Sequence, residues 1–371
     1  MAKHIDNETF ETKKYQAWFS YLHNIPLKLR LKMIEELDTA KSVYEANDTR
    51  LLEISGVNLN TISLIQAMKK KSPDEIYEQI LESDADLTSI EDKDYPLLLR
   101  DIPDCPYSLF YKGTLPPPKI PSIGIVGARM CTNYGSRIAY EIAHSLSKAS
   151  YNIVSGMALG TDRHAHAGAL DANGITTAVL GCGVDICYPP KNKDLYKRII
   201  ERGCIISEYT IHTQAVSTHF PRRNRIISGM TSSLIVTEAR LKSGSLITAN
   251  LSSSYNRDVY ALPGRINDPL SLGTNHLISE GALMLESIET LLDDLNSKFE
   301  TNIEKPTVES ILSLSEREKN VYDKIDYYAI HIESLIELCS NYDIKEIYTC
   351  INSLKEKGKI KEIFPDYFVR N

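Results

Sequence analysis

A cluster of basic residues stands out in a chain whose formal net charge is −7. Between Phe220 and Ser245 the chain has five basic residues and one acidic residue. An aromatic ring can stack a base, guanidinium groups pair with phosphates, and small residues at a helix start offer backbone N–H groups to an anion. The cluster therefore predicts a site for single-stranded nucleic acid. Its candidate residues are Phe220, Arg222, Arg223, Asn224 and Arg225, followed by Lys242, Ser243, Gly244 and Ser245.

The sequence predicts that a parallel sheet positions these residues. From 122 to 298, near-continuous apolar runs rich in β-formers alternate with amphipathic helical stretches. Such a pattern is typical of strands that helices cover on both faces. The sequence thus predicts an α/β fold, a Rossmann-like doubly wound and mostly parallel sheet. The expected strands lie near 123–127, 153–156, 177–181, 205–208, 234–238 and 259–264.

Ligands of an open α/β sheet bind outside the carboxyl ends of its strands, so the residues that follow each run should share one crevice. Gly127 and Arg129 follow the first run, and the basic cluster flanks the fourth and fifth. Arg129 ahead of a helix would bind a phosphate, although pairing with an internal carboxylate is the competing interpretation. If 222–225 is helical, Arg222 and Arg225 share one face, with Phe220 at its entry.

Known cofactor and catalytic patterns are missing from the sequence. Residues 124–129 lack the G-x-G-x-x-G spacing of dinucleotide sites, and 242–248 lacks the Walker A pattern. Asp162 and His166 could serve as metal ligands or acid–base groups, but a structural hydrogen bond between them is preferred. We therefore expect no cofactor, no metal and no enzymatic activity.

Three further segments flank the sheet. Residues 13–83 have helical periodicity and predict a small SAM-like or helix-hairpin-helix domain, with a plain packing module as the alternative. Residues 84–121 are rich in proline and predict an extended linker that packs on the sheet domain. Residues 306–371 predict three helices and a hairpin, the order of a winged helix. Acidic residues outnumber basic ones there, which favours a protein-interaction role over DNA reading.

The composition is that of a globular protein of two or three domains. The seven scattered cysteines favour a reducing compartment over a disulfide framework. The sequence has no apolar run near the length of a membrane span, so we expect a cytoplasmic protein.

Taken together, these motifs resemble the DNA-processing protein A family (DprA, also called Smf). The resemblance implies a protein that binds and protects incoming single-stranded DNA and helps to load the RecA recombinase in natural transformation. It also implies a homodimer built on the Rossmann-like domain. The DNA contacts that it implies are Arg129, Phe220, Arg222, Arg223, Asn224, Arg225, Lys242, Ser243, Gly244 and Ser245. The matching motifs lie at 95–96, 109–113, 126–129, 155–162, 165–166, 188–190, 220–227, 242–248 and 263–264.

Two other functions compete with this interpretation. The first is a nucleotide phosphoribohydrolase with a related fold, whose Pro-Gly-Gly-x-Gly-Thr turn is not continued by Pro263-Gly264-Arg265. The second is a scaffold whose cations only pair with internal carboxylates. Weaker oligo-dT binding by an Arg222→Glu, Arg225→Glu variant would support the leading interpretation. Release of free base from nucleoside monophosphates would support the enzyme, and absence of any salt-sensitive DNA shift would support the scaffold.

Overall fold

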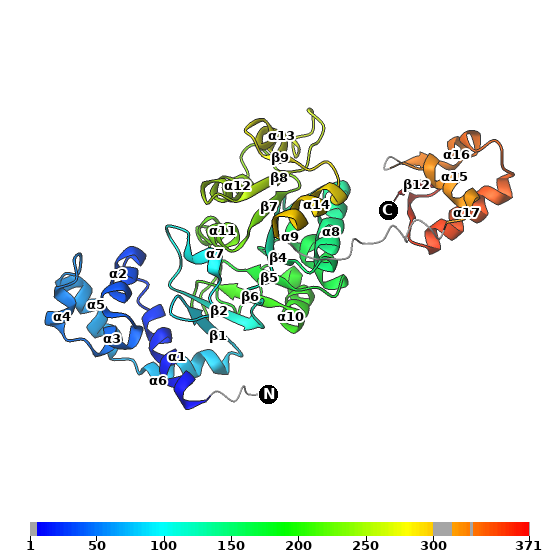
Figure 1. The fold of residues 1–371 in the computed structure, drawn as a ribbon. Helices are drawn as coiled ribbons and strands as arrows, with labels where there is room; N and C mark the ends of the chain where they lie inside the picture. Colours follow the sequence, from blue (N-terminus) through cyan, green and yellow to red (C-terminus); the bar gives the residue numbers. More distant parts are fainter. Residues whose placement is uncertain (1–5, 300–313, 327–328, 371) are drawn as a thin grey trace. The chain divides into compact units, whose positions relative to one another are not determined.

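The computed structural model of the chain describes residues 6–299, 314–326 and 329–370. It divides into two compact units, Met1–Ile303 and Glu304–Asn371. Figure 1 shows the helices and strands of both units. The domain boundary expected at 306 lies outside the described residues.

The first unit is built on a nine-stranded sheet with the order β1-β2-β6-β5-β4-β3-β7-β8-β9. The strands from β3 to β9 pair in parallel, whereas β1 and β2 are antiparallel to their neighbours. This confirms the predicted Rossmann-like α/β fold. The parallel strands are β3 (Ser122–Val126), β4 (Asn152–Ser155), β5 (Thr176–Val179), β6 (Cys204–Ser207), β7 (Ser233–Val236), β8 (Asp258–Ala261) and β9 (Leu283–Met284).

Helices cover both faces of the sheet because successive strand residues point to opposite sides. In β3, Ile123 and Ile125 join one hydrophobic core with α8, α9 and α14, whereas Val126 joins another with α11, α12 and α13. Figure 1 shows these two helical layers. The helices are α8 (Asn133–Lys148), α9 (Thr161–Asp171), α10 (Lys193–Arg202), α11 (His219–Met230), α12 (Gly244–Ser254), α13 (Leu272–Ser279) and α14 (Ile288–Phe299).

Residues 84–121, predicted as an extended linker, instead contribute two strands to the sheet. They contain β1 (Asp86–Ser89), α7 (Leu97–Arg100) and β2 (Ser108–Gly113). The strand β2 pairs with β6, which places Phe110 opposite Ser207. Local sequence does not reveal this pairing because the partner lies far along the chain.

The N-terminal helices pack against the β1–β2 end of the sheet. Their core surrounds the fully buried Trp18, and the ring of Phe19 lies 4.5 Å from that of Tyr107. The assignment of this part as SAM-like stays a prediction. The helices are α1 (Asn7–Ser20), α2 (Leu27–Leu37), α3 (Ala40–Glu45), α4 (Asp48–Leu52), α5 (Leu59–Lys69) and α6 (Pro73–Glu82).

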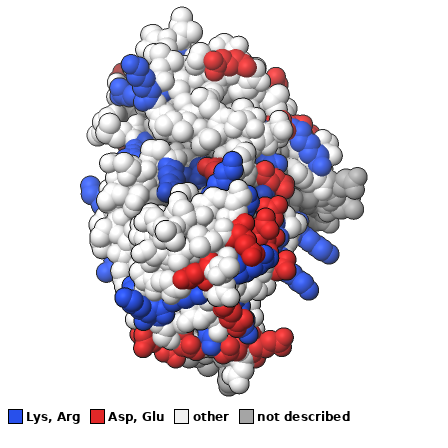
Figure 2. Space-filling model, turned by 90° about the vertical axis from the view of Figure 1, so that its left-hand side faces the viewer, with Lys and Arg blue, Asp and Glu red and all other residues white. Residues whose placement is uncertain are grey.

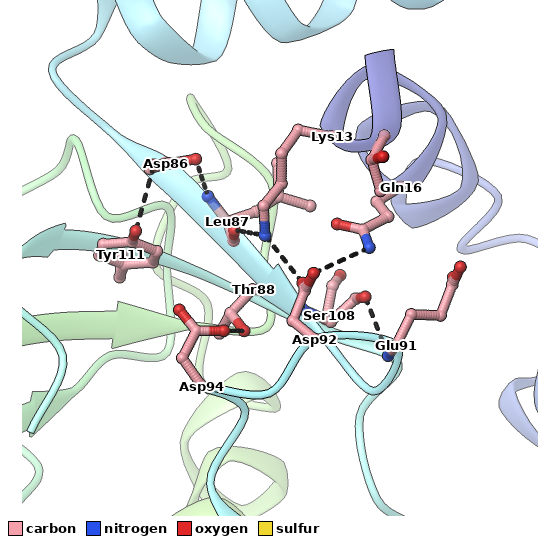
Figure 3. A network of polar contacts seen from close by, with 12 residues as sticks. Lys13, Gln16, Asp86, Leu87, Thr88, Glu91, Asp92, Asp94, Ser108 and Tyr111 are labelled. Carbon is pink, nitrogen blue, oxygen red and sulfur yellow. Dashed lines mark hydrogen bonds and ion pairs between the residues drawn. The ribbon is translucent and has the colours of Figure 1, made fainter. Parts of the chain in front are cut away.

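A polar network also fastens α1 to the sheet (Figure 3). The Lys13 ammonium donates to the Leu87 carbonyl and to Asp92, at 2.8 Å each. The Gln16 amide donates to the other oxygen of Asp92, at 3.1 Å. Lys13 and Asp92 are mostly shielded from solvent, so screening weakens this pair less than an exposed one. These contacts therefore hold α1 in a fixed position against the edge of the sheet.

The second unit has a hydrophobic core of its own, formed by residues such as Val321, Leu335 and Ile351. In its described residues, a three-stranded antiparallel sheet with the order β10-β12-β11 accompanies three helices. These elements lie close to the predicted stretches, and the winged-helix assignment stays a prediction. They are α15 (Glu316–Lys324), β10 (Ile330–His331), α16 (Ile332–Leu338), α17 (Ile344–Glu356), β11 (Ile360–Phe364) and β12 (Tyr367–Arg370).

Charge is distributed locally on the surface. Figure 2 shows one face, on which acidic side chains gather mainly in its lower half while basic ones stand in small separate groups. Positive charge therefore acts through individual sites on this face. Within the described ranges, none of the helices has the length and apolar character needed to span a membrane.

Candidate nucleic-acid interface

The topology of the sheet places a crevice beside β3. From β3 the chain adds β4, β5 and β6 on one side, and then crosses to the other side of β3 to form β7. Such a switch point is where open α/β sheets bind ligands. A cavity of about 550 Å³ lies there. It brings together eight predicted site residues, namely Gly127, Arg129, Phe220, Arg223, Asn224, Ser243, Gly244 and Ser245.

Gly127 and Arg129 form the first wall, directly after β3. An added Cβ at Gly127 would lie 2.5 Å from the Thr161 hydroxyl and 2.8 Å from that of Thr237, so only glycine fits. Arg129 is exposed, and its guanidinium carbon lies 5.6 Å from the centre of the Phe220 ring. Among the described residues Arg129 has no carboxylate partner. Its charge therefore stays available to a ligand.

Two stacked aromatic rings line the crevice. Phe220, in the first turn of α11, is half-buried, and its ring stacks on that of Tyr188 with centres 5.5 Å apart and planes at 26°. Tyr188 is itself exposed and lines the cavity. Sequence reasoning did not name Tyr188 as a site residue, although Tyr188-Pro189-Pro190 belongs to the family motifs. A stacked pair with Arg129 above it offers both π and cationic contacts.

The start of α12 forms the opposite wall. Gly244 is exposed, and nothing lies within 4 Å of the position that its Cβ would take. The hydroxyls of Ser243 and Ser245 lie 2.6 Å apart, and the Asn224 amide donates to the Gly244 carbonyl at 3.3 Å. The first backbone N–H groups of a helix favour an anion. Lys242 is exposed beside this turn without lining the cavity.

Arg223 lies beneath the crevice as a structural cation. It is 5% exposed and donates to the carbonyls of Gly156 (2.8 Å) and Val179. Its guanidinium would collide with any side chain at position 156. Burial lowers the pKa of Arg223, and the nearby carboxylate of Asp162 opposes this shift. Arg223 therefore contributes positive potential and shape to the crevice.

Arg222 and Arg225 face away from the crevice, toward Glu208. Arg225 is buried and lies 2.6 Å from Glu208 and 3.2 Å from Asp104. Arg222 is half exposed, 3.5 Å from the other oxygen of Glu208. The expected open surface with Phe220 and two cations is therefore not formed: the two arginines share a face of α11, but the ring points elsewhere and one cation is buried.

Asp162 and His166 have structural partners, although not each other. Asp162 accepts hydrogen bonds from the backbone N–H groups of Gly156 and Ala158. Burial raises the pKa of Asp162, an effect that Arg223 opposes. The His166 ring contacts the Thr176 hydroxyl at 2.6 Å, and its burial lowers its pKa to about 3. A neutral, fully enclosed imidazole is poorly placed for acid–base work.

Comparison with known proteins places the chain in a family. The model of the family "DNA recombination-mediator protein A" matches residues 86–296. Protein Smf of Synechocystis is 35% identical over 292 residues, which cover 77% of this chain and 73% of that protein. DNA processing protein DprA of Streptococcus pneumoniae is 44% identical over 204 residues, 55% of this chain and 72% of that protein.

Solved structures agree with this result. The X-ray structure of DprA from Streptococcus pneumoniae has a TM-score of 0.69 and 35% identity, covering 76% of this chain and 97% of that one. DNA processing protein A from Helicobacter pylori, described for its single-stranded DNA binding mode, has a TM-score of 0.52 and 29% identity, covering 57% and 96%. The fold, the motifs and these likenesses together show that the chain belongs to the DNA recombination-mediator protein A family, also called DprA or Smf.

Proposed function

We propose that this chain binds single-stranded DNA in the crevice beside β3, protects incoming DNA and assists the loading of RecA recombinase in natural transformation and homologous recombination. One observation carries the binding proposal. The exposed Arg129, the stacked rings of Phe220 and Tyr188, and the open start of α12 at Gly244 line the same cavity. Rings and cations at these positions suit a strand whose bases are unpaired.

The contacts in this proposal carry little sequence information. Every base has a face that can stack on a ring, and phosphates are common to all sequences. A duplex keeps its bases stacked inside and cannot place one against Phe220 without unpairing it. We therefore expect preference for single strands with weak dependence on base composition.

The proposal extends to partners and place of action. The family relationship supports RecA as a partner, a homodimer formed through the Rossmann-like domain, and action in the cytoplasm. Binding without catalysis is also part of the proposal, since Asp162 and His166 are committed to internal contacts. Release of free base from nucleoside monophosphates would instead favour a phosphoribohydrolase.

The test is fluorescence anisotropy of labelled oligo-dT and of a duplex of equal length. We expect tighter binding of the single strand by the wild type, and weaker binding by Arg129→Gln. Arg202→Gln is the matched control, since Arg202 is exposed on α10 away from the crevice and bonds the Asn173 side chain. Equal affinity of wild type, Arg129→Gln and Arg202→Gln for oligo-dT would refute the assignment of the crevice.

A further inference from the structure

A second cavity, of about 330 Å³, lies between the N-terminal helices and the loop that follows β6. The end of α1 and the start of α2 form one side, and the segment after β6 with the first turn of α11 forms the other. The polar network of Figure 3 fastens α1, whose end borders this cavity, to β1 and to Asp92. Its cationic, imidazole and hydroxyl groups include Arg30, His23, Arg222, His219, Thr210 and Thr213.

Arg30 is the buried cation of this cavity. Only 6% of the residue is exposed, and its Nε has no hydrogen-bond partner among the described residues. Burial lowers the pKa of Arg30, yet a guanidinium keeps its proton in proteins. An uncompensated buried charge is costly, so a built site of this kind gains stability from an anion.

The carboxylate on the cavity wall does not neutralise this charge. Glu208 attracts Arg30 electrostatically without forming an ion pair with it. The ion pairs of Glu208 are with Arg225, at 2.6 Å, and with Arg222, at 3.5 Å. Three arginines therefore surround one carboxylate, and among the described residues only Arg225 has a second acidic partner, Asp104. The cavity keeps a surplus of positive charge.

Hydrogen-bond donors accompany the cations. Tyr209 lines the cavity, and its hydroxyl is shielded from solvent and has no hydrogen-bond partner among the described residues. The Tyr209 ring is fixed by stacking on His219, with centres 3.9 Å apart. Guanidinium forks together with hydroxyl donors are the groups that bind phosphate oxygens.

We propose that this cavity is a second anion-binding site of the chain, which takes a phosphate group in contact with Arg30, Arg222 and Tyr209. The group belongs either to a nucleic-acid strand or to a small phosphate ester. The first turn of α11 separates the two sites: His219 and Arg222 line this cavity, whereas Phe220 and Arg223 line the crevice. A strand that leaves the crevice over this turn would reach the second site. The proposal of a phosphate site here does not depend on DNA binding in the crevice.

The primary test is thermal unfolding in inorganic phosphate against chloride at equal ionic strength. A ligand that binds only the folded chain raises the midpoint in a concentration-dependent way. We expect this rise in the wild type and in Lys28→Gln, an exposed control on the same helix as Arg30. In Arg30→Gln and Arg222→Gln we expect at least tenfold weaker apparent phosphate affinity. Because Arg222 is half exposed, its variant carries the test even if Arg30→Gln does not fold.

Two oligonucleotides distinguish the sources of the phosphate group, one of about four and one of about sixteen dT residues. If the site takes the strand, Arg30→Gln and Arg222→Gln weaken only the longer oligonucleotide, and saturation with it abolishes the phosphate effect. If the site takes a small phosphate ester, both oligonucleotides bind these variants normally and the phosphate effect persists. Phosphate binding without any oligo-dT binding would refute the proposed function and leave the second site intact. Equal phosphate responses of the wild type, Arg30→Gln and Arg222→Gln would overturn the second site.

Discussion

Replacing Phe220 by alanine removes the ring on which we expect a base to stack. The ring is half-buried, stacked on Tyr188, and lies 5.6 Å from the guanidinium carbon of Arg129. A stacked base contributes about 1–3 kcal/mol, which corresponds to roughly 5- to 150-fold weaker binding of oligo-dT. Phe220→Tyr keeps the ring and should bind within about threefold of the wild type, a difference under about 1 kcal/mol.

The salt dependence separates stacking from charge. Phe220 carries no charge, so the slope of log K against log salt should be the same for Phe220→Ala as for the wild type. Arg129→Gln removes one phosphate contact and should reduce the slope by about 0.7. The assay is the fluorescence anisotropy of labelled oligo-dT over a series of salt concentrations. The thermal unfolding midpoint of Phe220→Ala checks that the fold around Tyr188 survives the loss of the stacked ring.

Two results would refute this reasoning. Binding of Phe220→Ala within about twofold of the wild type would show that no base stacks on the ring, since such a change is below about 0.5 kcal/mol. A reduced salt slope in Phe220→Ala would show that the substitution disturbs the neighbouring cations instead. The first outcome would remove the ring from the proposed contact, and the second would assign the effect of Phe220→Ala to the cations beside the ring.

Three further predictions concern residues around the site. Arg225→Gln should lower the free energy of unfolding by about 3–5 kcal/mol, because it leaves the largely shielded Glu208 carboxylate without its closest partner. Chemical denaturation measures this, and a loss below about 1 kcal/mol would contradict it. Gly127→Ala should lower the free energy of unfolding by about 1–3 kcal/mol, because the added methyl group would collide with two hydroxyls. Gly244→Ala should change it by less than about 0.5 kcal/mol. Equal unfolding midpoints of the two variants would be inconsistent with the close packing at Gly127. His166 has a pKa of about 3 when folded and near 6.5 when unfolded, so the unfolded chain binds an extra proton as the pH falls below about 6.5. Its contribution should therefore destabilise the chain by about 2 kcal/mol at about pH 5 relative to pH 7, and His166→Asn should lose correspondingly less stability on acidification; parallel pH profiles would contradict this.

The sequence predicted the central sheet well because each parallel strand is a short, nearly continuous apolar run. The strands β3 to β8 all lie at or beside the predicted runs. The same local rule missed β1 and β2. Prolines lie between these two strands and after β2, and β2 is fixed by antiparallel pairing with β6, which no neighbouring residue indicates.

The sequence predicted which segments meet beside β3, but not which way each side chain there points. The rule that ligands gather at strand ends brought Gly127 and Arg129 to the same cavity as Phe220 and the turn at Gly244. The sequence did not show which of the neighbouring arginines are exposed and which are internal, because composition does not say which side of a helix is buried. Arg223 and Arg225 proved to be internal, with carbonyl or carboxylate partners. The second cavity depends on contacts between distant segments and has no sequence motif of its own.

Photo-crosslinking tests the central claim most directly. An oligo-dT that carries 5-iododeoxyuridine is irradiated with the full chain, and the adducts are located by mass spectrometry. The proposal predicts adducts on Phe220 and Tyr188, whose rings stack in the crevice, and their loss when unlabelled oligo-dT competes. Adducts confined to the C-terminal unit, or to surfaces of the first unit away from the crevice, would contradict the account.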